Sequence, residues 1–214
     1  MNKWFIRRAN IVTGGASPTP PSPGGLPAGY TELEYIENTG GSYLTTTIVP
    51  TATTGILAKY TSTNNNDRCI IGLREDSSTN SRFLLGKATN NYYGWGSYTA
   101  WSYQTKAVIG SLNWLNDGKA IVYDHSEVQQ KSANLSTLPF TPVSTIGIFK
   151  GGGYYTNIWL GKIYYVKFSS GSTITNNFVP AKHDSTGEVG LYDIVGNEGF
   201  LTNQGTGDFS YGTL

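Results

Sequence analysis

From Tyr30 onward, short runs of β-branched and aromatic residues alternate with clusters of glycine, asparagine, aspartate and serine. Such runs pack well on a pleated sheet, and the clusters supply the backbone conformations that turns require. No window shows the uninterrupted apolar stripe of an amphipathic helix. Strands at spacings of roughly ten to fifteen residues indicate an all-β sandwich or barrel.

The turn residues between these runs predict where each strand begins and ends. The dipeptide Asp117-Gly118 is the strongest signal, because it favours the tight turn of a hairpin between its flanking strands. The triple glycine at 151–153 is expected to separate two further strands. We expect strands at 43–49, 56–60, 69–73, 82–87, 92–98, 106–114, 120–123, 144–149, 157–168 and 188–193, with a weaker pair at 199–202 and 208–211.

Charge and cysteine content exclude several classes of function. Charged residues make up 14% of the chain and the net charge is +1, so no strong field draws nucleic acid or an anionic membrane. No stretch approaches the roughly eighteen apolar residues of a membrane span. The single cysteine, Cys69, excludes an intramolecular disulfide and a Cys-rich zinc site, and its apolar surroundings predict a small buried side chain.

The first 29 residues differ from the rest and divide the chain into three parts. Residues 1–13 are dense in large apolar and basic groups, and residues 14–29 are rich in proline, glycine and serine. A stretch of the second kind forms a semi-extended linker that could span on the order of 50 Å. We therefore expect an N-terminal anchor peptide at 1–13, a linker at 14–29 and a sandwich domain at 30–214.

Two interpretations of the leading peptide stay open. It is either a disordered tail with a chance apolar patch or a docking peptide that orders on a partner. We favour docking, since exposed apolar side chains are a liability unless they are covered. In that interpretation Trp4, Phe5 and Ile6 are apolar anchors, while Arg7 and Arg8 make polar contacts with the partner.

No pattern of catalytic carboxylates is evident. Retaining glycoside hydrolysis needs two carboxyl groups about 5–5.5 Å apart, for example at alternate positions of one strand. Glu32 and Glu34 have that spacing but lack a third partner, so solvated surface acids are the better interpretation of the acidic groups. These groups are Glu32/Glu34/Glu37, Glu75/Asp76, Asp124/Glu127 and Glu188/Asp193.

Nucleophilic and metal chemistry have equally little support. The two histidines, His125 and His183, read as polar loop residues, and no Gly-x-Ser-x-Gly elbow is present. We expect no enzyme activity and no cofactor. Calcium is possible in a fold of this class, but its candidate ligands read as ordinary turn residues. These candidates are Asn66, Asp67, Asp76 and Asp117.

Aromatic density is the outstanding feature of the composition, with 15 tyrosines and 5 tryptophans. Aromatic rings stack on sugars and are favoured at interfaces, because they give rigid contact area at low entropic cost. The competing interpretation is ordinary sheet packing and cross-strand pairing. We expect binding from the aromatic residues carried on loops. The candidate glycan-binding residues are Tyr98, Trp101, Tyr103, Tyr154 and Tyr155.

The sandwich region opens with LPAGYTELEYIENTG and closes with FVPAKHDSTGEVGLYD. These two segments resemble laminin-G-like, concanavalin A-like domains of phages and prophages of gut bacteria, and they carry the most specific similarity. The resemblance spans residues 26–212. Further matching parts are the turn at 202–207, the hairpin at 116–119 and the strand at 161–167.

The resemblance implies a concanavalin A-like jelly-roll β-sandwich and a place on a phage particle. It transfers no catalytic residue, because the Glu-x-Asp-x-Glu strand of the related glucanases is missing. We expect a virion structural protein, a head or tail fibre or a capsid decoration protein, which displays a lectin-like sandwich.

The expected partners follow from that placement. They are a capsid or tail protein bound through the N-terminal peptide, further copies of the chain in a homo-oligomer, and host-surface or mucus glycans, with neither nucleic acid nor a membrane among them. The basic start lacks the apolar core of a secretory signal, so we expect release by host-cell lysis. A bacterial surface adhesin is the alternative, and a glycan-degrading enzyme a more distant one.

Overall fold

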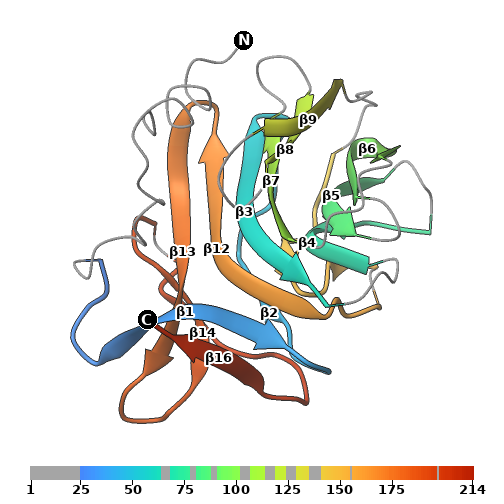
Figure 1. The fold of residues 1–214 in the computed structure, drawn as a ribbon. Coiled ribbons are helices and arrows are strands. Elements are labelled where there is room, and N and C mark those ends of the chain that lie inside the picture. The colour runs from blue at the N-terminus through green and yellow to red at the C-terminus, as the bar shows by residue number, and fades with distance from the viewer. Residues whose placement is uncertain are drawn as a thin grey trace.

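The structure is a computed structural model. It describes residues 25–63, 68–77, 81–87, 91–101, 107–113, 119–123, 129–134, 141–154, 156–196 and 198–214. Every element within these ranges is a β-strand. The described residues contain no helix that is long and apolar enough to cross a bilayer. The strands form two curled, mainly antiparallel sheets packed into a sandwich (Figure 1). The prediction of an all-β sandwich is confirmed.

The larger sheet contains the long, curved strands of Figure 1 and runs nearly the length of the domain. The order across the sheet is β15 (Phe200–Leu201), β14 (Val189–Asp193), β13 (Thr173–His183), β1 (Tyr30–Asn38), β12 (Gly161–Ser170), β3 (Thr54–Ser62), β7 (Ala107–Asn113), β8 (Lys119–Tyr123) and β9 (Gln129–Asn134). In addition, β16 (Phe209–Thr213) pairs with β1.

The smaller sheet covers one face of the larger one. Its order is β2 (Leu44–Thr45), β10 (Gly147–Ile148), β4 (Arg68–Arg74), β5 (Arg82–Lys87) and β6 (Asn91–Trp101). A two-residue strand, β11 (Gly152–Gly153), pairs with β4 in parallel. The triple glycine therefore does more than separate two strands, as we had predicted, because two of its residues join the sheet.

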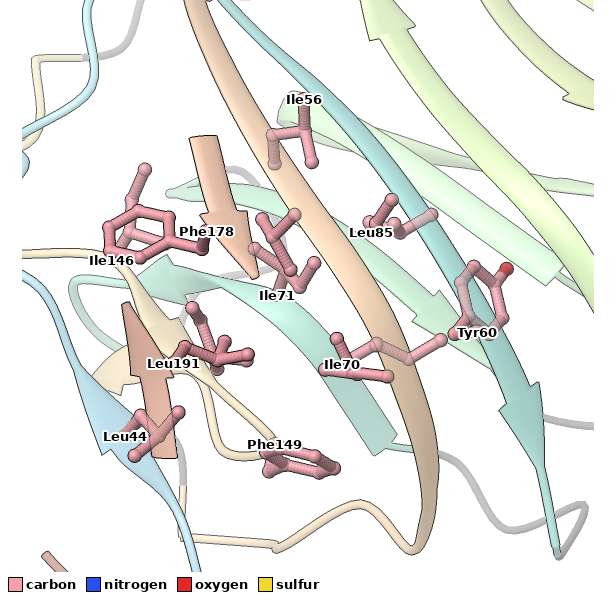
Figure 2. Packing of buried hydrophobic residues seen from close by; sticks show 14 of the residues in the cluster. Leu44, Ile56, Tyr60, Ile70, Ile71, Leu85, Ile146, Phe149, Phe178 and Leu191 are labelled. Atoms are coloured by element: carbon pink, nitrogen blue, oxygen red, sulfur yellow. The ribbon is translucent and has the colours of Figure 1, made fainter. Parts of the chain in front are cut away.

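Strand alternation directs apolar side chains between the sheets. In β3 the inward residues Ile56, Ala58 and Tyr60 are fully buried, while the residues between them are half-buried. Figure 2 shows Ile56 and Tyr60 facing Ile71 and Leu85 of the smaller sheet. Burial of each isoleucine or leucine side chain of this set stabilises the fold by about 1.5–3 kcal/mol. Cys69 is fully buried, as the sequence predicted.

Phe149 has an unusual backbone conformation, and its side chain is buried in the core. Its φ is +68°, a conformation that costs a non-glycine residue about 1–3 kcal/mol. Its amide donates to the carbonyl of Ile70 at 2.8 Å, and its carbonyl accepts from the amide of Trp159 at 2.5 Å. Its ring stacks on Trp159 and tilts against Phe209, with centroids 5.6 and 5.1 Å away. These hydrogen bonds and ring contacts fix Phe149 and Trp159, the two residues that flank the segment 150–158.

Most predicted strands are found, and the differences are informative. The strand expected at 43–49 is only the short β2, while β1, β9 and β13 were not predicted. β7 and β8 pair as the predicted hairpin, with Asn113 opposite Lys119. The turn residues Asn116, Asp117 and Gly118 lie outside the described residues.

Candidate functional site

The sequence candidates fall into three groups by what the structure describes of them. The anchor residues Trp4, Phe5, Ile6, Arg7 and Arg8 lie outside the described residues, as do Tyr103 and Tyr155. Tyr98 and Trp101 were expected on a loop, but they lie on β6, which extends to Trp101 and for which the structure describes the backbone alone. Tyr154 is the member of the set whose side chain is described.

Tyr154 lies at the rim of the smaller sheet. It follows β11, is 55% exposed, and donates its amide to the carbonyl of Arg74 at 2.6 Å. The Arg74 guanidinium lies over its ring, 5.5 Å from the centroid. Gly153 permits this approach, because its φ is +63° and a Cβ there would lie 2.3 Å from the Arg74 carbonyl oxygen. The ring is therefore presented to solvent beside a cation.

Glu75, next to this rim, has a structural role. Its carboxylate accepts hydrogen bonds from the Val143 and Ser144 amides, both at 2.7 Å, and from the Ser144 hydroxyl at 2.6 Å. Partial burial pushes the pKa of Glu75 upward, but these hydrogen bonds outweigh it and hold the pKa below its ordinary value. Glu75 therefore ties the 143–144 segment to the end of β4, rather than being a purely solvated acid as predicted.

Asp193 corrects the same prediction more strongly, because only 3% of the residue is exposed. Its Oδ1 accepts from the amides of Asn177 at 2.8 Å, Gly196 at 2.9 Å and Val195 at 3.2 Å. Its Oδ2 accepts from the Asn176 side chain at 2.6 Å. Asp193 thus joins β13 to the turn after β14, and it is a buried structural carboxylate.

A hollow of about 290 Å³ opens beside β14 and β16 at the edge of the core. Phe209, only 7% exposed, and the half-buried Val189 provide its apolar part. Tyr211 lies two positions after Phe209 on β16 and so shares its face, but it is 40% exposed. The lining residues are Gly187, Glu188, Val189, Asn203, Asp208, Phe209 and Tyr211.

The polar residues of the hollow differ in role: Asn203 is structural, whereas the two carboxylates are exposed. Asn203 accepts from the amides of Tyr43 at 3.1 Å and Gly205 at 2.8 Å, and donates to the Gly207 carbonyl, so its amide holds the 203–207 turn. Glu188 and Asp208 are exposed at the hollow and can accept further hydrogen bonds. The hollow therefore offers an aromatic ring, an apolar surface and two carboxylates to a ligand.

Tyr211 also has a cationic neighbour. The Lys182 ammonium lies 5.6 Å from the centre of the Tyr211 ring. Lys182 pairs with Val189 across β13 and β14, which places it beside the hollow. The sequence did not predict this site, although it predicted a strand at 208–211 and Glu188 was among its acidic groups. Its lining comes from segments that only the β1–β13–β14 and β1–β16 pairings bring together.

Metal binding has no positive support among the described residues, which contain no group of three or more His, Cys, Asp or Glu able to hold an ion. Of the calcium candidates, Asn66, Asp67 and Asp117 lie outside the described ranges. Asp76 accepts a hydrogen bond from the Ser81 hydroxyl.

No protein-family model and no curated protein sequence matches the chain. Among solved structures, the chain is similar to a protein from Bacteroides ovatus to which carbohydrate binding is ascribed. The TM-score is 0.57 and the identity is 14%, over 86% of this chain and 61% of the other. The chain thus spans less than two thirds of that protein's length, and the likeness shows a shared lectin-like sandwich fold.

Proposed function

We propose that the sandwich is a non-catalytic carbohydrate-binding module and that the hollow between β14 and β16 is its saccharide site. The observation that carries the proposal is the combination of Tyr211, an apolar surface and two carboxylates around one open hollow. The ascribed carbohydrate binding of the structural neighbour supports the same function. A sugar has apolar C–H faces and hydroxyl donors, and it needs both kinds of partner.

The residues divide the recognition between them. The Tyr211 ring stacks on a C–H face of the sugar, while Val189 and Phe209 cover the adjoining apolar edge. Glu188 and Asp208 accept hydrogen bonds from sugar hydroxyls, and these charge-assisted bonds are stronger than neutral ones. With the Lys182 ammonium beside them, the two carboxylates leave one net negative charge at the hollow, which disfavours an anionic sugar and suits neutral glycans.

The test is a glycan array probed with a multivalent form of the full chain, because multivalent display makes weak contacts measurable. Tyr211→Ala should abolish the neutral-glycan signals. The matched control is Tyr154→Ala, which removes an exposed tyrosine that lies beside Arg74 and does not line the hollow, and it should leave the signals unchanged. Loss with Tyr154→Ala alone would move the site to the rim, and an array without neutral signals would contradict the proposal.

We also propose that the module is carried on a phage particle through residues 1–13. The support is the apolar and basic composition of that peptide, its separation by a linker, and the resemblance of the two ends of the sandwich region. Deletion of residues 1–13 should leave the sandwich folded but abolish incorporation into particles. Normal incorporation of the deletion variant would contradict the anchor assignment. If the chain is instead a bacterial adhesin, deletion of residues 1–13 should reduce its display at the cell surface.

One feature favours a hydrolytic alternative, because Glu188 and Asp208 line the same hollow. Two carboxyl groups at a suitable separation would be an acid and a base or nucleophile for glycoside hydrolysis. The discriminating measurement is release of reducing ends from the glycans that bind. The proposal expects none from the native chain. Release that is lost in Glu188→Gln or Asp208→Asn would establish the enzyme instead.

A further inference from the structure

The turn that joins β13 to β14 begins at a histidine and ends at the hollow. His183 is the last residue of β13, and Gly187 and Glu188, at the other end of the turn, both line the hollow. The His183 amide donates to the Glu188 carbonyl at 2.9 Å, and the Gly187 amide donates to the His183 carbonyl at 2.8 Å. The conformation of this turn therefore decides where the Glu188 carboxylate lies at the hollow.

The His183 imidazole holds the turn from within through its Nδ1 atom. The Thr186 amide donates to Nδ1 at 3.3 Å. The Ser185 and Thr186 hydroxyl oxygens lie 3.2 and 3.1 Å from the same atom. An amide N–H can only donate, so Nδ1 is an acceptor in this arrangement. The hydrogen bond therefore assigns a neutral imidazole with its proton on Nε2.

One hydroxyl group connects this imidazole to a carboxylate of the hollow. Thr186 Oγ1 donates to Glu188 Oε2 at 3.1 Å and accepts from the Glu188 amide at 3.3 Å. His183, Thr186 and Glu188 thus form one continuous set of hydrogen bonds between the end of β13 and the residue that precedes β14. A change at Nδ1 reaches Glu188 through a single residue.

Protonation of Nδ1 is incompatible with this set of hydrogen bonds. An imidazolium carries a proton on both ring nitrogens and accepts at neither. The Thr186 amide then loses its acceptor and faces a second N–H group, so the turn that positions Gly187 and Glu188 must rearrange. Histidine is the side chain whose ordinary titration lies between about pH 5 and pH 8, which is where we expect the rearrangement.

Two charged residues flank His183 in the sequence. The Lys182 ammonium lies 5.6 Å from the centre of the Tyr211 ring, at the hollow. The Asp184 carboxylate accepts from the Thr31 hydroxyl at 2.6 Å. The ammonium disfavours an imidazolium and the carboxylate favours one, so these two neighbours act in opposite directions.

The neighbouring strand β1 brings a ring and a further carboxyl group to His183. The Tyr30 ring meets the imidazole edge to face, with centroids 4.8 Å apart. Glu32 lies opposite Ala181 in the β1–β13 register, which makes it a diagonal neighbour of His183. Burial raises the pKa of Glu32, so this group also gains a proton as the pH falls. Glu32→Gln is therefore the variant that separates the two titrations.

We propose that His183 is a positioning residue that makes saccharide binding in the hollow dependent on pH. The neutral imidazole holds the turn in the conformation that presents Glu188, and the imidazolium releases it, so saccharide affinity falls as the pH falls. This inference rests on the proposed saccharide site and adds the regulation of that site. By linkage, a bound saccharide favours loss of the proton from His183.

The experiment measures the affinity of the full chain for a neutral glycan selected on the array, at about pH 8 and about pH 5.5. The native chain should bind about fivefold more weakly at the lower pH, as expected for the loss of one hydrogen bond. His183→Asn keeps an acceptor near the position of Nδ1 but cannot titrate, so its affinity should be equal at both pH values. His183→Phe keeps a ring against Tyr30 but has no acceptor, so it should bind weakly at both.

Two further measurements separate His183 from its surroundings. Glu32→Gln is the matched control for the neighbouring carboxyl group, and it should retain the pH dependence of the native chain. In the isotopically labelled native chain, addition of the glycan at about pH 6 should move the imidazole nitrogen resonances towards those of the neutral ring.

Four outcomes would overturn the inference. These are equal affinity of the native chain at both pH values, a native-like pH dependence in His183→Asn, loss of the pH dependence in Glu32→Gln, and imidazole resonances that do not respond to the glycan. Failure of the saccharide site itself looks different. In that case the native chain binds no neutral glycan even at the higher pH, or Tyr211→Ala binds it as the native chain does.

Discussion

The ring of Tyr30 meets the ring of His183 edge to face, with centroids 4.8 Å apart and planes at 80°. Tyr30 is the first residue of β1 and His183 the last of β13, and the two are register partners. They come from the two segments that carry the sequence resemblance. The pairing of β1 with β13 therefore joins the two ends of the domain, and the hollow opens beside this junction.

Tyr30→Ala should destabilise the fold by about 2 kcal/mol, because aromatic contacts of this kind contribute about 0.5–1.5 kcal/mol each. Besides His183, the Tyr30 ring contacts Tyr192 at 4.8 Å and Phe200 at 5.1 Å. Urea unfolding measures the loss. Tyr30→Phe keeps the ring and should stay close to the native value. Equal stability of the alanine variant would show that the ring cluster does not hold the junction.

Asp193→Ala should cost about 3 kcal/mol, since it leaves buried donors of β13 and the 194–196 turn without their acceptor. The control is Asp208→Ala, which removes an exposed carboxylate and should change stability by less than about 0.5 kcal/mol. Thermal and urea unfolding of the two variants compare them directly. Similar effects from both would contradict the structural role of Asp193.

Glu75 and Glu32 should affect stability with opposite dependence on pH. Hydrogen bonds hold the folded pKa of Glu75 below the ordinary 4.5, so its carboxylate stabilises the fold above that value. The contribution is lost as the pH falls through the folded pKa. The stability advantage of the native chain over Glu75→Gln should therefore be present at neutral pH and shrink as the pH falls below 4.5.

Glu32 provides the matched comparison, because burial raises its pKa. A raised pKa favours the protonated form in the folded chain, so its contribution is present at low pH and is lost as the pH rises. Relative to Glu32→Gln, the native chain should gain stability on acidification. Urea unfolding at several pH values measures both pairs, and parallel trends would refute the assignment.

The sequence predicted the core strands well where one face is apolar. Ile56, Ala58 and Tyr60 alternate as a half-buried strand must, and β3 was predicted from them. β13 was missed because Asn176, Asn177 and Pro180 read as strand breakers. Asp193 accepts from the side-chain amide of Asn176 and from the backbone amide of Asn177, and no local pattern reports that partner.

The candidate site was harder to predict for a related reason. The sequence drew attention to aromatic clusters on loops, and Tyr154 is indeed exposed there. Tyr211 looked like part of a weak terminal strand. Its proximity to Glu188 depends on the pairing of β1 with both β16 and β13, which are contacts between distant parts of the chain. Periodicity and turn signals describe only local structure.

The most direct test of the carbohydrate-binding claim is to locate a bound neutral saccharide by NMR. Backbone amide shifts of the isotopically labelled chain are followed during titration with a glycan selected on the array. We expect the largest changes at residues 187–189 and 208–211, around the hollow. Changes concentrated at 74–77 and 152–154, or an absence of saturable changes, would contradict the account.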